Sequence, residues 1–496
     1  MIQRKGNGCA LRIAPRSQPL RAVLLAVLLS SIAGMAAPLR ASLDSGSWPM
    51  FHRDAGHTGL SPLLAPEIGV IAWTRSLSDT VEFSSPAVTS SATVLVGDQG
   101  KELWAFDLWG NERWNYHALG NIRYSSPAVR SNGTVYFGAG DGKLYAVWPS
   151  GRLAWSVQTG AAVKTSPAIA PDGTIYAGSD DGSLWAVRAD GSVKFTFATG
   201  DTVRSSPALA ADGTIVFGSH DGMVRALWPN GSLRWEVATG GPIKTAPAIR
   251  QNHVIVASSD GFLYDFSIDG TFNWATYTGN NLRSSPAFGS TGKIYLGVDT
   301  KISCFHDDGS PSFSYETGAK IYSSPAVTSD YDGQEIVLCG SDSGYLYAVK
   351  AGTLLWSCNL GAPVRSSPAI GPNRIAYVGA MNGNLYAIGY VNPASAGGDA
   401  ATSTVGLALS PNPVRGDSPV SIHLLDPRGA GRLGDAPILI LDPSGRRIRS
   451  LQAAAGEGIA VWDGRDMAGR RVPAGVYWIR VGELDRRTST RLVRIP

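Results

Sequence analysis

The chain has 496 residues, of which 44% are hydrophobic and only 17% are charged, with 59 glycines and 14 tryptophans. This composition excludes an intrinsically disordered chain, which would carry more charge and fewer aromatic residues, and the length allows more than one domain. The net charge of +4 gives no support to a nucleic-acid partner, because the first 36 residues hold five of the 43 basic residues and no acidic one, and the other 38 face 39 acids.

The N-terminus has the layout of a secretory signal. A basic leader precedes the apolar run from Ala22 to Ala37, and Gly34-Met35-Ala36 fits a small-residue cleavage site. We expect residues 1–36 to be the signal peptide of an exported protein, and residues 37–62 to form an extended segment after it. The alternative is an uncleaved anchor, although the apolar run is slightly short for a membrane span. We expect no transmembrane span after signal cleavage.

Residues 63–390 repeat one unit, whose Pro-Ala motif recurs at intervals of 39 to 43 residues. The prolines are Pro86, Pro127, Pro167, Pro207, Pro247, Pro286, Pro325 and Pro368. Each unit contains four short runs rich in Val, Ile, Tyr and Trp, separated by turn residues, as in Thr174–Gly178 and Ser183–Val187. A fixed period of this length indicates stacked units, and four strands per unit are typical of a β-propeller.

The ends of the repeat array indicate how the propeller closes. Aromatic residues of the fourth strand occur at Trp73, Trp114, Trp155, Phe195, Trp235, Trp274, Phe313 and Trp356. Trp73 comes before the first proline, and nothing equivalent follows the last unit. We therefore predict that the strand around Val70–Arg75 completes the last blade and removes its open edge. The predicted fold is all-β, an eight-bladed propeller of four-stranded blades.

The units resemble the propeller repeats of the pyrroloquinoline-quinone (PQQ-like) type, in which a Gly-x-Leu-Tyr-Ala-Val strand and a Gly-x-x-x-Trp strand recur. The opening segment Trp48–Ser61 resembles the segment that precedes the first blade in many such proteins, and the resemblance covers residues 48–391. It implies the fold, with the Ser-Pro-Ala strand innermost, where small side chains are required. It leaves the activity open, because quinone-dependent dehydrogenases and non-enzymatic outer-membrane assembly factors of the BamB type share the repeat.

The sequence lacks what this family's dehydrogenases would need. The resemblance would imply two adjacent cysteines, an acidic calcium ligand set and a catalytic Asp, whereas the chain has no Cys-Cys pair and its units are close to minimal length. We expect no catalysis, no PQQ and no calcium. The cysteines of the exported chain are expected to be buried apolar fillers: Cys304, Cys339 and Cys358.

Other candidate sites are weaker. No two of the seven histidines stand at metal-ligand spacing, so we predict no metal site, and His52 and His57 are assigned a structural role in the leading segment. The acidic stretch Thr328–Glu335 is interpreted as a surface loop, with a weak cation site as the alternative.

One position of the unit carries side chains that packing alone does not require. Three residues before each proline stand Phe83, Tyr124, Lys164, Arg204, Lys244, Arg283, Tyr322 and Arg365. Repeat symmetry places all eight near one mouth of the channel, beside the hairpin turns between second and third strands. We predict that this electropositive ring with stacking surfaces binds a protein, an anionic glycan or an acidic peptide. The alternative is that the long side chains only cap the channel.

The tail differs in character. Residues 391–405 are small and polar, as in a flexible linker, and residues 406–496 alternate strand runs with turn clusters, which predicts a small β-sandwich. Its motifs resemble the immunoglobulin-like domain of the flagellar hook-capping (FlgD-like) type: Ser410–Pro413, Asp442–Arg447, Trp462–Gly464 and Ala474–Tyr477. In exported bacterial proteins such C-terminal domains resemble type IX secretion sorting tails, which implies the secretion machinery as a partner and a cell-surface or extracellular location.

Together these patterns predict a non-enzymatic exported binding or scaffold protein that presents a PQQ-like propeller. The alternatives are a periplasmic scaffold for outer-membrane assembly and a PQQ-dependent dehydrogenase.

Overall fold

The structure is a computed structural model. It describes residues 48–279, 281–330 and 332–389, and in the tail residues 406–410, 414–415, 419–425, 437–443, 446–452, 459–481 and 489–495. The predicted signal peptide, the linker at residues 391–405 and residues 411–413 of the first tail motif lie outside these ranges. Within them the regular elements are β-strands and one 3₁₀ turn, η1 (Pro372–Arg374). None of the described helices is long and apolar enough to cross a membrane.

Seven four-stranded sheets and one five-stranded sheet form the described part of the chain from residue 60 to residue 388, and we number them one to eight along the chain. From inner to outer strand, the first sheet contains β3 (Ala87–Val88), β4 (Thr93–Gly97), β5 (Glu102–Asp107) and β6 (Glu112–His117), and the second contains β7 (Ala128–Val129), β8 (Val135–Gly138), β9 (Lys143–Val147) and β10 (Leu153–Gln158). The third sheet contains β11 (Ala168–Ile169), β12 (Ile175–Gly178), β13 (Ser183–Val187) and β14 (Val193–Ala198). The fourth contains β15 (Ala208–Leu209), β16 (Ile215–Gly218), β17 (Met223–Leu227) and β18 (Leu233–Ala238).

The fifth sheet contains β19 (Ala248–Arg250), β20 (His253–Ala257), β21 (Phe262–Ser267) and β22 (Phe272–Tyr277). The sixth contains β23 (Ala287–Phe288), β24 (Ile294–Val298), β25 (Lys301–Phe305) and β26 (Pro311–Glu316). The seventh adds β1 (Leu60–Leu64) to β27 (Ala326–Ser329), β28 (Glu335–Gly340), β29 (Tyr345–Lys350) and β30 (Thr353–Asn359). The eighth is β31 (Ala369–Gly371), β32 (Ile375–Ala380), β33 (Asn384–Ile388) and β2 (Ile71–Ser76).

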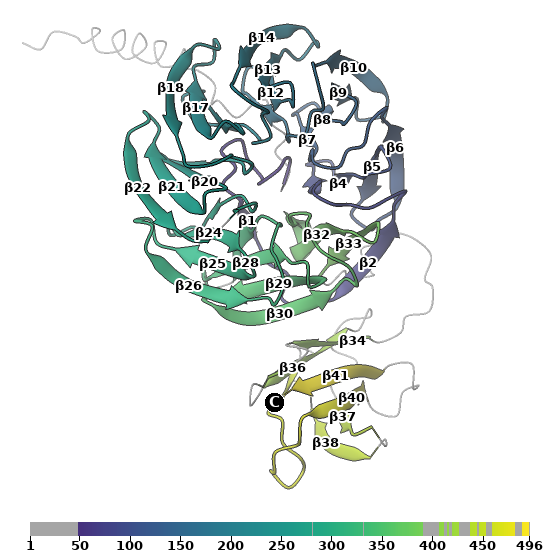
Figure 1. The fold of residues 1–496 in the computed structure, drawn as a ribbon. Coiled ribbons are helices and arrows are strands. Elements are labelled where there is room, and N and C mark those ends of the chain that lie inside the picture. The colour runs from purple at the N-terminus through teal and green to yellow at the C-terminus, as the bar shows by residue number, and fades with distance from the viewer. Residues whose placement is uncertain are drawn as a thin grey trace, which may run out of the picture. The chain divides into compact units, whose positions relative to one another are not determined.

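The sheets stand around a common centre, with the first strand of each unit toward that centre and the fourth outside (Figure 1). Most second strands, such as β8 and β16, are buried along their whole length, whereas outer strands such as β18 alternate between exposed and less exposed positions. β-branched and aromatic residues suit both environments. The predicted strands at residues 174–178 and 183–187 agree with β12 and β13 to within one residue.

The two ends of the repeat array meet in one sheet. β2 pairs antiparallel with β33, so an N-terminal strand supplies the outer strand of the eighth sheet. The sequence-based prediction for Val70–Arg75 is therefore confirmed. One feature was not predicted: β1, from the leading segment, pairs in parallel with β27 and makes the seventh sheet five-stranded.

Hydrogen bonds link successive inner strands through the residue just before each proline, and we call these eight positions the serine ring. In seven of the eight links, the backbone N–H of one member donates to the Oγ of the next at 2.9–3.1 Å. The members are Ser85, Ser126, Ser166, Ser206, Ala246, Ser285, Ser324 and Ser367. The N–H of Ser367 donates to Ser85, so the series returns to its start. The serines are thus acceptors as well as small side chains.

The leading segment, residues 48–64, lies along the inner strands of several sheets. Its carbonyls accept backbone N–H groups from sheets one, two, four, five, six and seven, including Val129, Leu209, Ile249, Phe288 and Val327, at 2.6–2.9 Å. Gly56 and Gly59 permit this close approach. A Cβ on Gly56 would lie 2.8 Å from the Ile249 carbonyl oxygen, and one on Gly59, where φ is +64°, would lie 2.7 Å from the Ala287 Cβ.

The outer strands are tied to the next sheet by tryptophan. The indole N–H of Trp155 donates to the Ala189 carbonyl, and that of Trp235 to the Ile268 carbonyl, both at 2.9 Å. In the same way Trp73 of β2 donates to Leu108 in the first sheet. The recurring glycine of the following turn, such as Gly270, packs against the indole ring, where a Cβ would clash.

The tail forms two sheets from its described residues. One contains β34 (Gly406–Ser410), β36 (Val420–Leu425) and β39 (Ile459–Trp462); the other contains β35 (Val414–Arg415), β41 (Ser489–Ile495), β40 (Gly475–Val481), β37 (Ile438–Leu441) and β38 (Arg447–Leu451). Buried residues of both sheets, including Ile422, Ile440, Trp462 and Ile479, form one hydrophobic core. The tail therefore has a core of its own.

Candidate functional site

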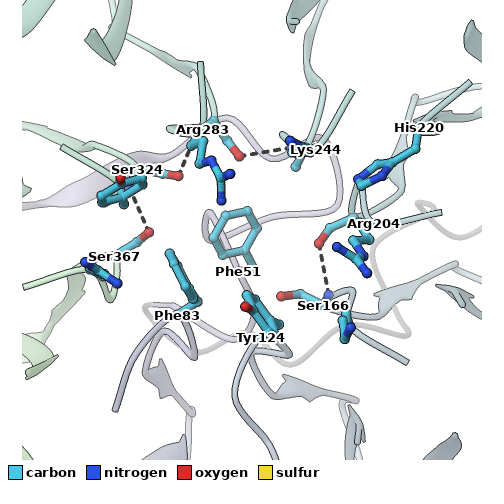
Figure 2. A pocket seen from close by; sticks show the side chains of 16 residues that line it. Phe51, Phe83, Tyr124, Ser166, Arg204, His220, Lys244, Arg283, Ser324 and Ser367 are labelled. Atoms are coloured by element: carbon cyan, nitrogen blue, oxygen red, sulfur yellow. Dashed lines mark hydrogen bonds between the residues drawn. The ribbon is translucent and has the colours of Figure 1, made fainter. Parts of the chain in front are cut away.

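All eight side chains predicted to gather at the channel mouth line a single cavity of about 220 Å³. We call them the mouth ring: Phe83, Tyr124, Lys164, Arg204, Lys244, Arg283, Tyr322 and Arg365. Each follows an outer strand and precedes the inner strand of its own sheet, so the repeat brings them to the same level. Members of the serine ring, together with Phe51 and His220, complete the lining (Figure 2).

Aromatic side chains form one side of the cavity. The rings of Phe83 and Tyr124 stack with centroids 5.0 Å apart, and Tyr322 meets Phe83 edge-on at 6.3 Å. The guanidinium of Arg365 lies 4.9 Å from the ring of Tyr322, within the range of a cation–π contact. This side of the cavity therefore offers apolar ring surface held in place by its neighbours.

Three of the five ring cations form ion pairs with carboxylates. Lys164 and Arg204 share Asp180 at 2.6 and 2.8 Å. Burial alone would raise the pKa of Asp180, but hydrogen bonds from Arg204 and Lys164 hold it below its ordinary value.

Arg365 bonds Asp342 at 2.9 Å and the buried Glu82 at 3.0 Å. The hydrogen bond to Asp342 raises the pKa of the guanidinium. Carboxylate partners therefore reduce the positive charge of the predicted ring unevenly around its circumference.

Lys244 and Arg283 are the remaining two cations, and neither forms an ion pair with a carboxylate in the described part of the chain. They are neighbours, in the fifth and sixth sheets, on the side of the cavity opposite Phe83 and Tyr124 (Figure 2). Burial, and then the charges of Arg283 and Arg204, lower the pKa of Lys244. This positive charge is not compensated within the site.

His220 stands beside these cations and lines the same cavity. Its Nε2 is buried and has no hydrogen-bond partner. Burial and the charges of Arg204 and Lys244 lower the pKa of the imidazole, so His220 is neutral at pH 7.

The leading segment supplies the centre of the lining. Phe51 lies in the middle of the ring in Figure 2, and its ring stacks on His52 with centroids 4.3 Å apart and meets His57 edge-on at 5.6 Å. Both histidines are fully buried. Burial lowers the pKa of His52 to about 4, and burial together with the charge of His52 lowers that of His57 to about 3. They support Phe51 as neutral side chains.

A family model described as outer membrane protein assembly factor BamB matches residues 90–236 and 204–302. The chain carries PQQ-like propeller repeats. No curated protein gives a significant match to the sequence.

Solved structures similar to the PQQ-like propeller include BamB from Moraxella catarrhalis, with a TM-score of 0.54 and 16% identity over 65% of this chain and 100% of that one. A europium-containing methanol dehydrogenase has a TM-score of 0.56 and 14% identity, covering 70% and 98%. The computationally designed Ika8 protein has a TM-score of 0.55 and 18% identity, covering 64% and 98%. At these identities the similarity shows the fold alone.

The other sequence candidates have structural partners in the propeller. The three described cysteines are buried, as predicted, and burial raises the pKa of the Cys304 thiol to about 11. In the acidic loop Asp330 bonds Lys350 at 2.5 Å, and Glu335 accepts the Tyr295 hydroxyl at 2.6 Å. These carboxylates are engaged by the protein, and no group of three or more potential metal ligands occurs in the described residues.

Sequence reasoning missed the residues that divide the mouth ring. Asp180, His220, Ser259 and Asp342 occupy one position, the first residue of the turn between second and third strands, where each backbone N–H donates to the segment before a ring residue. Aligning the turns would have revealed the difference between Asp and His or Ser. The contribution of Phe51 has no signal in the repeat, because the leading segment lies outside it.

Proposed function

We propose that this protein is an exported, non-enzymatic binding or scaffold protein whose ligand site is the cavity inside the mouth ring. The observation that carries the proposal is the meeting of eight repeat-related aromatic and cationic side chains in one cavity. A packing role would be met by small apolar side chains at this position, whereas these side chains leave charge and ring surface exposed to a ligand.

The proposed architecture is an eight-bladed propeller closed by its N-terminal strand. The pairing of β2 with β33 completes the last sheet. The hydrogen bond from Ser367 to Ser85 and the indole bond from Trp73 to Leu108 link that sheet to the first. A closed ring fixes the distances across the cavity, because no blade can move outward without breaking these links.

A non-enzymatic role is supported by the chemistry of the lining. None of the sixteen lining residues is Asp, Glu or Cys. The carboxylates closest to the ring, Asp180, Asp342 and Glu82, are engaged by its cations and by Arg123. A calcium ion and a catalytic carboxylate, which the quinone enzymes of this fold would imply, thus find no suitable residues here. The similarity to a methanol dehydrogenase is one of fold.

The tail is proposed to be an immunoglobulin-like domain used for sorting or attachment. Two sheets share one core, and the Tyr477 hydroxyl donates to the Pro473 carbonyl four residues upstream at 2.7 Å, as in the tyrosine corner of such sandwiches. If it is a sorting tail, deleting residues 406–496 in the native host should leave the protein in the periplasm. Unchanged surface display after the deletion would contradict this role.

The second candidate is a periplasmic scaffold in outer-membrane assembly, which the match to a BamB family model favours. Cell fractionation of the full-length protein separates the two, because surface exposure is expected only for the first. A periplasmic protein that copurifies with the outer-membrane assembly machinery would favour the second.

The binding role is tested with an array of acidic glycans, neutral glycans and acidic peptides. We expect the purified protein to bind at least one class, and the Phe83→Ala/Tyr124→Ala variant to lose that binding, because the aromatic wall is removed. Trp148→Ala is the matched control, since it removes an aromatic ring that is 48% exposed and outside the cavity. No binding by the wild type, or equal binding by the ring variant, would contradict the proposed site.

A further inference from the structure

The mouth ring is divided into two chemically different halves, and this division restricts the ligand. Phe83 and Tyr124 form one side, and Lys244 and Arg283, which have no carboxylate partner in the described part of the chain, form the other, with Phe51 between them (Figure 2). Tyr322 lies where the two sides meet, 6.3 Å from the Phe83 ring and 5.9 Å from the Arg283 guanidinium. A ligand that uses both halves needs an anionic group at one end and an apolar ring face at the other.

The repeat itself explains why the charge remains at these two positions. The turn of each sheet lies beside the ring residue of the next sheet, so Asp180 reaches Arg204 and Asp342 reaches Arg365. At the equivalent turn positions before Lys244 and Arg283 stand His220 and Ser259, which are neutral. The turns of sheets three and seven carry a counter-ion, and the turns of sheets four and five do not.

The serine ring is interrupted at the same place. Ala246 has no hydroxyl to accept the backbone N–H of Ser206, whereas the seven other links are made. Ser206, Ala246 and His220 all line the cavity. The Ser206 N–H, which has no serine hydroxyl to donate to in the next unit, and the unpartnered Nε2 of His220 therefore belong to the same part of the lining as the two cations without a carboxylate partner. Backbone N–H groups and cations together are suited to a carboxylate.

The rest of the cavity favours a sugar ring over a peptide. The N–H groups of the inner strands are largely taken by the serine ring and the leading segment, so an added peptide strand finds few backbone partners. The cavity of about 220 Å³ is smaller than the roughly 300–1,000 Å³ of sites for drug-sized molecules, which fits one sugar unit. The faces of aromatic rings suit the apolar face of a pyranose.

We propose, resting on the binding function above, that Lys244 and Arg283, with His220 and the Ser206 N–H, hold the carboxylate of a terminal uronic-acid unit whose ring lies against Phe51 and the aromatic wall. The planar guanidinium of Arg283 can donate hydrogen bonds to both carboxylate oxygens, and the ammonium group of Lys244 adds a second positive charge. A neutral sugar would fill the same space without satisfying these donors.

The full-length protein is titrated with D-glucuronate and with D-glucose by calorimetry or NMR. We expect glucuronate to bind at least about ten-fold more tightly than glucose, since a charged hydrogen-bonded contact is worth about that factor or more. Lys244→Met and Arg283→Met should each weaken glucuronate binding by a similar factor and leave glucose binding unchanged. Lys194→Met, at an ion pair with Asp172 outside the cavity, is the charge-matched control.

Two further variants test the cause of the unpaired charge. His220→Asp reproduces the arrangement of the third and seventh sheets, so it should give Lys244 a counter-ion and abolish the preference for glucuronate. Ala246→Ser should complete the serine ring, occupy the Ser206 N–H and weaken binding several-fold. Melting temperatures verify that each variant is folded, and Lys244→Arg should retain binding.

The outcomes are distinguishable. Equal affinity for glucuronate and glucose, or unchanged binding in Lys244→Met and Arg283→Met, overturns the carboxylate subsite but leaves the binding function if Phe83→Ala/Tyr124→Ala still abolishes the array signal. Displacement of glucuronate by equimolar acetate or phosphate shows a site for small anions and overturns the sugar. Preferential binding of an acidic peptide does the same. No binding of any probe contradicts the binding function itself.

Discussion

Single carboxylates decide the charge of the mouth ring. Asp180 pairs with two cations, and Glu82 and Asp342 pair with a third, so two of the five ring cations have no carboxylate partner among the described residues. Glu82 is only 3% exposed, and Arg123 pairs with it as well. Removing one partner of such a buried pair costs more than the pair contributes, because the other charge is left without a partner. The paired cations are therefore structural, and Lys244 and Arg283 are available to a ligand.

His52 and His57 make stability depend on pH. Their pKa values are lowered by burial from 6.5 to about 4 and about 3, so the folded protein binds fewer protons than the unfolded chain below pH 6.5. Their contribution is full above pH 6.5 and is lost as the pH falls. We expect urea unfolding, followed by tryptophan fluorescence, to show a loss of roughly 2 kcal/mol per histidine between pH 6.5 and pH 5.

Asparagine replaces both histidines as the control for this pH dependence. His52 and His57 have φ values of 51° and 54°, a conformation that asparagine tolerates. The double variant should be less stable at pH 7.5 but should lose much less stability between pH 6.5 and pH 5. A wild-type stability that is flat over this range would refute the role of the buried imidazoles.

At the scale of the element, short inner strands are stabilised by contacts outside their own sheets. Most inner strands have only two residues, so their ladders alone contribute little. The serine ring links them sideways, and the leading segment covers their central edge. Paired edges also block association between molecules.

Completing the serine ring should stabilise the propeller. In Ala246→Ser the new hydroxyl lies where the other serines accept an N–H, so the variant gains one buried hydrogen bond, about 1 kcal/mol. Chemical unfolding at pH 7.5 measures this gain. Ser324→Ala removes an existing link and should destabilise by a similar amount. If Ala246→Ser is instead destabilising, the hydroxyl does not reach Ser206.

The hydrogen bonds from tryptophan indoles to the next sheet should also contribute to the stability of the propeller. Trp235→Phe keeps an aromatic ring, as nature does at Phe195 and Phe313, but removes the indole N–H that donates to Ile268. We expect a loss of about 1–2 kcal/mol because a carbonyl is left unpaired. Thermal unfolding of this variant is compared with Trp148→Phe, which changes an exposed indole. Equal effects of the two changes would mean that the link contributes nothing.

For the whole molecule, the N-terminal residues complete the fold that the repeats begin. β1 and β2 complete the seventh and eighth sheets, and Trp356 of the seventh sheet donates to Pro66 at 2.9 Å. These contacts make residues 60–76 part of the propeller, although they precede its first unit.

Removing these N-terminal strands should therefore disrupt the whole ring. A chain that begins at residue 77 leaves the edges of β33 and β27 unpaired, and we expect it to aggregate and to lose a single cooperative unfolding transition. Size-exclusion chromatography and calorimetry provide the measurement. A chain that ends at residue 405 is the control, because the tail has its own core. A monomeric truncated protein with an unchanged melting temperature would contradict closure by β2.

Much of the propeller was predictable because the period fixes which residues are equivalent. The strand ranges, the role of Val70–Arg75 and the meeting of the eight mouth-ring residues follow from local pattern and repeat symmetry. Repeat symmetry could not predict the contacts that differ from one unit to another. Pairing of Arg204 with Asp180 depends on contact between two sheets, and the position of Phe51 depends on a segment without repeats.

The serines before the prolines show the same limit. Their small size was inferred from crowding near the axis, but their hydroxyls accept hydrogen bonds from the neighbouring unit, which no single unit reveals. The missing link at Ala246 is visible in the sequence as one changed letter. Only the hydrogen bonds between neighbouring units show that this alanine removes an acceptor.

The contacts that join the first and last parts of the propeller also set the order of assembly. Ser367 and Ser85 are 282 residues apart in sequence, and Trp356 and Pro66 are 290 apart. During synthesis the first strands emerge long before their partners exist, so they wait unpaired until the final unit has been made. Contacts between such distant segments make folding slow. The same separation would keep the propeller from closing during export, because the first strands cannot pair until the last unit is present.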